Sequence, residues 1–343
     1  MKNFCMSCLT LTLLLTACGG GGSGPSPAPP AIQTQELAPF DAALVKNWPG
    51  LPNVGMSCFM NTSIKLLAAM PEMDPFLAAN PGDGAKVKAV RSSLREVISF
   101  IRSGGPQGQD VRTLVQAVLA AFREHPQLRQ YVAGVGDTGG YSDALLRSIL
   151  SVLGSADEFK IRSVRKEINP HRSPRPAYGA ETITALNIAQ DPALGGFDLA
   201  PINSVGEFLH RLTSGPGTFD LGGGGTLTTH IHPTHIPRNV LLDVAHLNPT
   251  KALQLSDQAE VPVYAVDQAR QSETRTREVH LQAAAASIFR GGHLWAVIRG
   301  DDGWYANDDS RPSRLVDRSE MDEQPDGRGG VARSINLILF KHD

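Results

Sequence analysis

Cysteine is scarce in this sequence of 343 residues, and it is unevenly placed. Three of the four cysteines are Cys5, Cys8 and Cys18, so Cys58 is the only thiol of the rest of the chain. A single thiol excludes an internal disulfide, and it excludes a zinc site built on cysteine pairs. Cys58 is therefore either a small buried hydrophobe or a thiol with a chemical use.

An excess of charge of either sign is also missing. The 32 Lys and Arg residues nearly balance the 34 Asp and Glu residues, the net charge is -2 and the pI is near 6.6. Nucleic-acid-binding domains usually carry a basic face and a high pI, so we expect no nucleic acid partner. Because 41% of the residues are hydrophobic, the chain can bury a core.

The first residues lack an apolar run long enough to span a bilayer. Lys2 is followed by a short apolar run, Leu9 to Thr16, which has the length typical of a signal peptide. The run ends at Ala17 and Cys18, and this ending resembles the lipobox of bacterial lipoproteins. We predict a signal peptide over residues 1–17 and lipidation at Cys18; an ordinary secretory signal with a chance cysteine is the alternative.

The segment after Cys18 is a predicted tether. Residues 19–30 are Gly, Ser, Pro and Ala alone, and such sequences are flexible or extended because they bury little apolar surface. We therefore assign residues 18–36 to a lipidated tether and residues 37–343 to one folded domain. The predicted location is the bacterial outer membrane or cell surface, with release to a host as the other possibility.

Helix patterns come first in this domain and strand patterns follow, which predicts an α+β fold. The segment 111–122 has apolar residues at three- and four-residue spacing, with Asp110 as the predicted N-cap. Further helices are predicted over 86–102, 141–153 and, in short form, 207–212. Strands are predicted over 239–247, 261–266, 278–288, 293–299 and 334–340. A cleft at the seam between the two halves would bring Cys58 and His293 together.

Cys58 follows a loop rich in Pro and Gly and precedes a helical pattern, so it is predicted to begin a helix. The helix dipole at such a position favours the thiolate, as does a nearby imidazolium, and the thiolate is the species that attacks a carbonyl. This position suits a nucleophile.

His293 begins a predicted strand that turns at residues 301–303 into a second strand ending in Asp308 and Asp309. Such a hairpin can return an acid to the side of the histidine, as the base and orienting acid of a triad require.

Both stretches resemble the ubiquitin-specific protease family. Its Cys box is matched here by Gly50, Leu51, Asn53, Gly55, Cys58, Met60 and Asn61, with Met56 and Lys65 as departures. Its His box is matched by Gly292, His293, Ala296, Trp304, Tyr305, Asp308, Asp309 and Ser310, with Leu294 and Asn307 as departures. Weaker similarities lie around Asp143, Pro237 and Phe340, so the resemblance extends over roughly residues 51–342.

The resemblance implies a papain-like cysteine protease fold with a helical thumb, an antiparallel β palm, and fingers that are reduced and hold no zinc. It implies Cys58 as nucleophile, His293 as general base, Asp308 as the acid that orients His293, Asp309 as a supporting acid and Asn53 as an oxyanion donor. The implied activity is that of a deubiquitinase, which hydrolyses peptide or isopeptide bonds after a Gly-Gly tail through a thioester. It requires no metal or cofactor.

The partner implied by this resemblance is ubiquitin or a ubiquitin-like protein on host conjugates, because bacteria generally lack ubiquitin. An exported protein of this kind would act as a virulence effector. Two alternatives stay open: a papain-like cell-wall peptidase lipoprotein, and an inactive surface lipoprotein that binds ubiquitin or a host protein.

Three histidines elsewhere form a His-x-His-x-x-His pattern, His230, His232 and His235. On a strand the first two would share a face, as metal ligands can. Thr228, Thr229, Pro233 and Pro237 around them favour a loop, and no nearby acid or cysteine completes a ligand set, so we predict no metal site.

Overall fold

The computed structural model divides the chain into two units, Met1–Glu36 and Leu37–Asp343, and it describes the second. Within that unit it describes residues 37–342 apart from 56, 106–109, 133–141, 170, 172, 185, 188–202, 215, 221–224, 245–253 and 326–330. The predicted signal peptide, Cys18 and tether, with Met56 and Tyr141, lie outside the described residues. None of the described helices is both long enough and apolar enough to cross a membrane.

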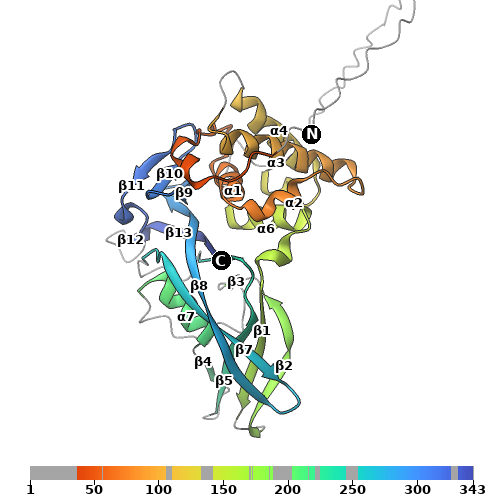
Figure 1. The fold of residues 1–343 in the computed structure, drawn as a ribbon, viewed down its shortest axis with the longest axis vertical. Coiled ribbons are helices and arrows are strands. Elements are labelled where there is room, and N and C mark those ends of the chain that lie inside the picture. The colour runs from red at the N-terminus through yellow and green to blue at the C-terminus, as the bar shows by residue number, and fades with distance from the viewer. Residues whose placement is uncertain are drawn as a thin grey trace, which may run out of the picture. The chain divides into compact units, whose positions relative to one another are not determined.

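Helices occupy the first part of the described unit (Figure 1). The 14-residue helix α4 begins after Asp110, whose side chain accepts a hydrogen bond from the Arg112 amide at 3.0 Å, so the predicted N-cap is confirmed. The helices are α1 (Cys58–Ala68), α2 (Asp74–Leu77), α3 (Ala85–Arg102), α4 (Val111–Glu124), α5 (Arg129–Val132), α6 (Ser142–Val152) and α7 (Val205–Ser214). Short 3-10 turns are η1 (Ala42–Asn47), η2 (Pro71–Met73), η3 (Ala156–Phe159) and η4 (Arg318–Glu320).

Strands form two sheets. The described strands are β1 (Ile161–Asn169), β2 (Ser173–Thr184), β3 (Leu186–Asn187), β4 (Pro216–Asp220), β5 (Thr226–His235), β6 (Asn239–Asp243), β7 (Gln258–Asp267), β8 (Ser272–Arg290), β9 (His293–Arg299), β10 (Trp304–Asn307), β11 (Arg314–Val316), β12 (Gln324–Pro325) and β13 (Val331–Lys341). One sheet has the order β2-β1-β5-β4. The other runs β11-β10-β9-β8-β13-β6-β3, with β12 on β13 and β7 on β8. The described pairs are antiparallel, except for the parallel pair β3–β6.

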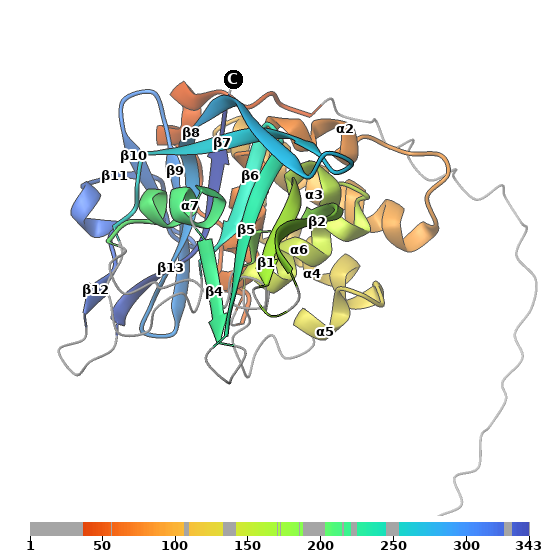
Figure 2. The ribbon, with the colours of Figure 1, turned by 90° about the horizontal axis from the view of Figure 1, so that it is seen from below.

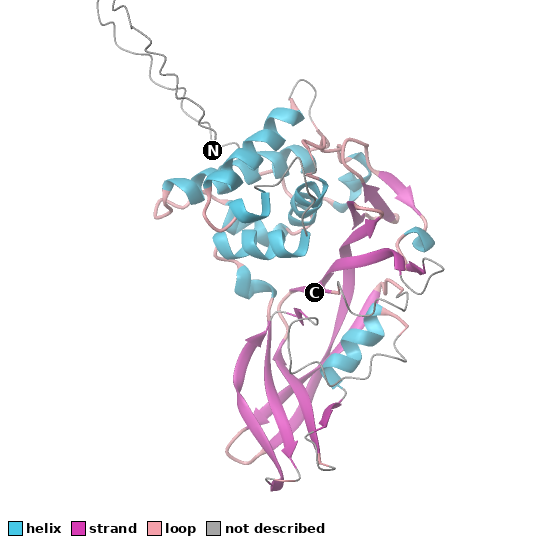
Figure 3. Ribbon diagram, turned by 180° about the vertical axis from the view of Figure 1, so that it is seen from behind, coloured by secondary structure: helices cyan, strands magenta, loops and turns pink. Residues whose placement is uncertain are grey.

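In the central strands of the larger sheet, successive residues alternate between two cores. In β9, Leu294, Ala296 and Ile298 join the core that contains α1, whereas Val297 joins the core that contains α7. Helix α7 packs against β5 and β7 (Figure 2). The view from behind in Figure 3 shows the other helices gathered at one end and the long strands at the other. The predicted mixture of helices and antiparallel sheets is therefore confirmed.

Three parts of the sheet structure differ from the sequence-based expectation. The segment around His230 and His232 is the strand β5 rather than a loop, because its backbone pairs with β1 and β4 on both sides. The hairpin of β1 and β2 was not predicted, since charged residues and prolines interrupt its apolar pattern. Strand β8 also begins earlier than expected, since Ser272–Leu281 pairs with β7.

Candidate active site

Helix α1 begins at Cys58, which is 5% exposed. The loop before it is organised by Asn53 and Ser57: Asn53 Oδ1 accepts from the Ser57 amide at 2.7 Å and from the Ser57 hydroxyl at 2.9 Å. The Val54 amide donates to Ser57 Oγ at 2.9 Å, and Gly55 has a φ of 70°, a conformation that favours glycine. Because Asn53 Oδ1 accepts both bonds, its amide nitrogen is the atom available to donate to a substrate oxygen.

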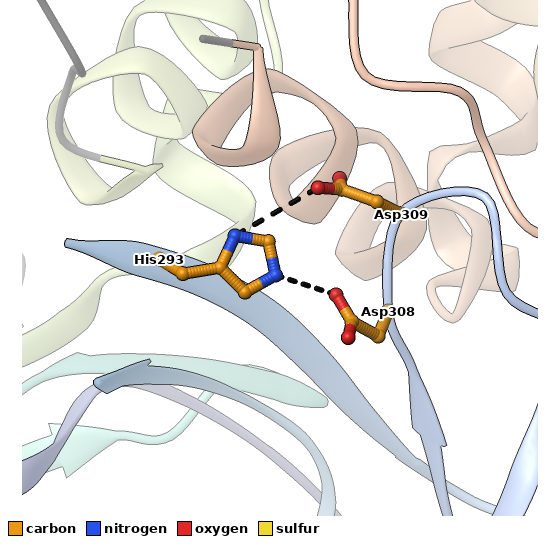
Figure 4. Close-up of side chains that lie close together, drawn as sticks. All are labelled: His293, Asp308 and Asp309. Atoms are coloured by element: carbon orange, nitrogen blue, oxygen red, sulfur yellow. Dashed lines mark hydrogen bonds and ion pairs between the residues drawn. The ribbon is translucent and has the colours of Figure 1, made fainter. Parts of the chain in front are cut away.

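His293 and the acids lie on the hairpin of β9 and β10, whose strands pair from Trp304↔Arg299 to Asn307↔Ala296. The pairing returns the chain to the start of β9, as the sequence predicted. His293 Nε2 lies 2.6 Å from Asp308 Oδ1, and the side chains of His293 and Asp308 are 38% and 29% exposed (Figure 4). A carboxylate on Nε2 fixes the ring orientation and leaves Nδ1 as the nitrogen that can take a proton.

Asp309 approaches the other side of the ring. Its Oδ2 lies 3.7 Å from His293 Nδ1 (Figure 4). Its Oδ1 accepts a 3.0 Å hydrogen bond from Asn61 Nδ2. The same Asn61 amide lies 3.2 Å from Leu51 O and 3.3 Å from Pro52 O. Asn61 thus joins the loop before Cys58 to the loop that carries the acids.

Lys65 is 1% exposed, and its side chain ends near the loop that carries Asp308 and Asp309. Its Nζ donates to Asn307 O at 2.9 Å. Burial lowers the pKa of Lys65 to about 7, and the charges of Asp309 and Asp308 oppose that decrease. Cys58, Asn61 and Lys65 are spaced i, i+3 and i+7, so they share one face of α1. The sequence showed this spacing, but Asn61 and Lys65 were not assigned a role.

Gly50 explains the close approach of the two loops. A Cβ atom at Gly50 would lie 2.2 Å from the carbonyl carbon of Ser310 and 2.5 Å from the Arg311 amide nitrogen. The Ser313 amide also donates to Trp48 O at 3.1 Å. Only glycine fits this contact without displacing backbone.

Helix α1 packs on β9, and the thiol of Cys58 interacts with the Leu294 backbone and with the charge of Asp309. Burial raises the pKa of Cys58, a backbone hydrogen bond from Leu294 opposes the increase, and the charge of Asp309 adds to it. The backbone amides of Phe59 and Cys58 at the helix start favour the thiolate, as expected, but burial has the larger effect on the pKa. The structure brings His293, Asp308 and Asp309 together. No hydrogen bond joins the described Cys58 thiol to His293.

The β5 histidines form a separate cluster. The rings of His230 and His232 stack 5.9 Å apart, and His232 meets Tyr264 edge-on at 4.6 Å. His235 is exposed at the end of the strand. Burial lowers the pKa of His232 to about 4, helped by the charges of His230 and Lys166.

Metal-ligand geometry is absent from that histidine cluster over the described residues. Among all the described residues, the group of three whose donor atoms lie within 4.8 Å of one another is His293, Asp308 and Asp309. In that group the ring and the Asp308 carboxylate bind each other directly.

Comparison with solved structures gives the fold. A chain of the SAGA Ubp8/Sgf11/Sus1/Sgf73 DUB module bound to ubiquitin aldehyde is similar at a TM-score of 0.60 and 12% identity, over 88% of this chain and 70% of that one. The same module with a variant Ubp8, bound to monoubiquitin, also gives 0.60 at 12% identity, over 91% and 72%. A third structure of the module gives 0.52 at 12%, over 88% and 69%.

The fold is therefore like that of a ubiquitin-specific protease of a deubiquitinating module. No protein-family model matches the sequence, and no curated protein does.

Proposed function

We propose that the unit from Leu37 onward is a cysteine hydrolase of the deubiquitinase type, acting at the C-terminal glycine of ubiquitin or a ubiquitin-like protein. The observation that carries the proposal is the 2.6 Å pair of His293 and Asp308, in which His293 begins the strand β9 against which the Cys58 helix packs. The likeness of the fold to a deubiquitinating module bound to ubiquitin supports the choice of substrate.

The proposed reaction begins with transfer of the Cys58 proton to His293 Nδ1. The thiolate attacks the carbonyl carbon of the terminal glycine, and the Cys58 amide and the Asn53 side-chain amide bind the oxyanion. His293 then protonates the leaving amine, the C–N bond breaks, and a thioester remains. In the second half His293 deprotonates a water molecule, which attacks the thioester and releases Cys58 and the carboxylate.

Each acid has a different part in this scheme. Asp308 holds the His293 ring through Nε2, and Asp309, held by Asn61, lies near Nδ1. The protonated ring would have a carboxylate on each side, which stabilises the imidazolium, whereas the charge of Asp309 opposes the thiolate. Burial raises the pKa of Cys58 and so favours its thiol form, which is why the scheme needs His293 as the acceptor of the proton.

In this proposal the helices α1–α6 are the thumb and the larger sheet is the palm. The sheet of β1, β2, β4 and β5 takes the place of reduced fingers without zinc, in keeping with Cys58 being the only cysteine after Cys18. No cofactor enters the scheme.

Export is the second part of the proposal. Residues 1–17 act as the signal peptide, Cys18 carries lipid, and residues 18–36 tether the hydrolase to the outer membrane or cell surface, where it meets host conjugates. Incorporation of labelled palmitate into the protein, and its loss in Cys18→Ser, tests this part. Labelling that persists in Cys18→Ser contradicts it.

A ubiquitin probe with a thiol-reactive C-terminus tests the hydrolase. We expect the domain of residues 37–343 to form a covalent adduct that Cys58→Ala abolishes while its circular dichroism stays unchanged. His232→Gln is the matched control, because it changes a histidine outside the site. A folded, reduced wild type that forms no adduct refutes the ubiquitin substrate. Stable non-covalent ubiquitin binding would then favour the inactive binder, and cleavage of cell-wall peptides would favour the peptidase.

A further inference from the structure

A pocket of about 300 Å³ opens beside His293, on the part of the larger sheet formed by the end of β8 and by β9, β10 and β11. Its floor is apolar and consists of Trp295, Val297, Ala306 and Val316. Trp295 also stacks on the His293 ring, with 6.1 Å between the centroids. The proposed function does not use this pocket.

The pocket lies on the His293 side of the candidate active site. Its lining includes His293 and Asp308 but neither Cys58 nor Asn53. Along β9 the side chains alternate, so Trp295 and Val297 face the pocket while Leu294 and Ala296 join the core around α1. A group bound here would therefore contact the base and its acid from the side opposite the nucleophile's helix.

Three arginines line the pocket, and they differ in how closely a carboxylate pairs with each of them. Arg314 makes a double ion pair with Glu320, at 3.1 and 2.7 Å. Arg311 reaches Asp308 only at 3.9 Å, and its side chain is 82% exposed. Arg290 is exposed, and no carboxylate of the described residues lies within 4.0 Å of it. Two guanidinium groups are thus available to an anionic ligand.

The proposed reaction indicates which part of a substrate would reach the pocket beside His293. The general base receives the thiol proton and hands it to the leaving nitrogen, so the leaving group departs on the side of His293. In an isopeptide that nitrogen is a lysine Nζ, and the residues flanking this lysine then lie near the base.

We propose that the pocket is a leaving-group subsite, which takes an acidic side chain close to the modified lysine of the substrate, with Arg290 and Arg311 as its ion-pair partners. The inference rests on the proposed function and adds a substrate preference to it. The apolar floor supports the methylene groups of the same segment, and Arg–carboxylate pairs supply the orientation.

Matched isopeptide substrates test this inference. Ubiquitin is joined to the lysine of a fluorescent peptide whose flanking residues are either Glu or Gln, and a ubiquitin–aminocoumarin substrate reports turnover without a flanking peptide. We expect kcat/KM to be about 2- to 5-fold higher for the Glu peptide, mainly through KM, and to lose this preference at high salt, since exposed ion pairs are worth little and are screened.

Three variants identify the partners. Arg290→Gln and Arg311→Gln should each reduce the Glu/Gln ratio, and the ratio cancels any effect of Arg311 on Asp308. Arg123→Gln, an exposed arginine of α4, should keep the full ratio. A wild-type ratio of one, or a ratio that survives the double Arg290/Arg311 change, overturns the subsite while aminocoumarin turnover upholds the hydrolase. Absence of turnover on every substrate refutes both.

Discussion

His293 and His232 both lie on strands of antiparallel sheets, and they differ in what surrounds their rings. His293 is 38% exposed, and its two nitrogens face Asp308 and Asp309. His232 is 7% exposed and lies against His230 and Tyr264, and neither of its nitrogens has a hydrogen-bond partner among the described residues. Burial lowers its pKa to about 4.

The comparison separates two criteria for a functional histidine, a shifted pKa and the geometry around the ring. A search for shifted pKa values would select His232. The geometry selects His293, because a base needs an acid that fixes its ring and a nucleophile nearby. At His232 the shift comes mainly from desolvation, which makes the charged ring unfavourable in the folded protein.

The largest expected effect separates the two histidines directly. His293→Gln should lower the turnover of ubiquitin–aminocoumarin by at least about 10³-fold, because general-base activation of the nucleophile is lost. His232→Gln should stay within about 2-fold of wild type, as expected of a change outside the site. Equal losses of turnover in folded His293→Gln and His232→Gln would show that the two histidines do not differ in catalytic role.

The second largest effect is expected for Asp308, the acid that pairs with His293. Asp308→Ala should lower kcat by about 10²-fold or more, because the His293 ring loses its 2.6 Å partner. Asp301→Ala, which changes an exposed acid in the turn of the same hairpin, serves as the control. A kcat for Asp308→Ala near that of Asp301→Ala would show that His293 is oriented by something else.

Lys65 allows a pH test of the buried charge under the site. Its folded pKa of about 7 lies below its ordinary value of 10.5, so the unfolded chain binds the extra proton between these pH values. Stability from this group is present above pH 10.5 and is lost as pH falls towards 7, by about 1.4 kcal/mol per pH unit. Relative to Lys65→Met, wild type should gain unfolding free energy between pH 7 and 9 in urea titrations. If the difference in unfolding free energy between wild type and Lys65→Met does not change with pH, the pKa of Lys65 is not lowered in the folded protein.

The smallest effect concerns His232, whose folded pKa of about 4 lies below its ordinary value of 6.5. Stability from the neutral ring is present above pH 6.5 and is lost as pH falls towards 4. His232→Phe should therefore flatten the decrease in unfolding free energy, by about 1–2 kcal/mol at pH 5. Thermal unfolding of both proteins between pH 4.5 and 7.5 measures this, and parallel curves would contradict it.

The sequence predicted the parts of the site that local pattern encodes. The helix after Cys58 and the hairpin from His293 to the acids both follow from periodicity and turn residues. The strand β5 was predicted wrongly, because threonines, histidines and a proline imitate a loop when the pairing partners are unknown. The burial that raises the Cys58 pKa was missed for the same reason, since it depends on packing against β9 rather than on the helix start.

Asn61 and Lys65 show the limit of local pattern most clearly. Their spacing from Cys58 indicated a shared helix face. Their partners are Asp309 and Asn307, 248 and 242 residues away along the chain. Contacts at that separation depend on how the sheet closes against α1, which periodicity does not encode.

These long separations also bear on when the protein becomes active. During synthesis Asn61 and Lys65 leave the ribosome first, and the residues that they bind follow 248 and 242 residues later. Closing so long a loop comes late in folding. A nascent chain therefore carries the Cys58 thiol before His293 and the two acids have been made, so under the proposed mechanism hydrolysis waits for the hairpin of β9 and β10.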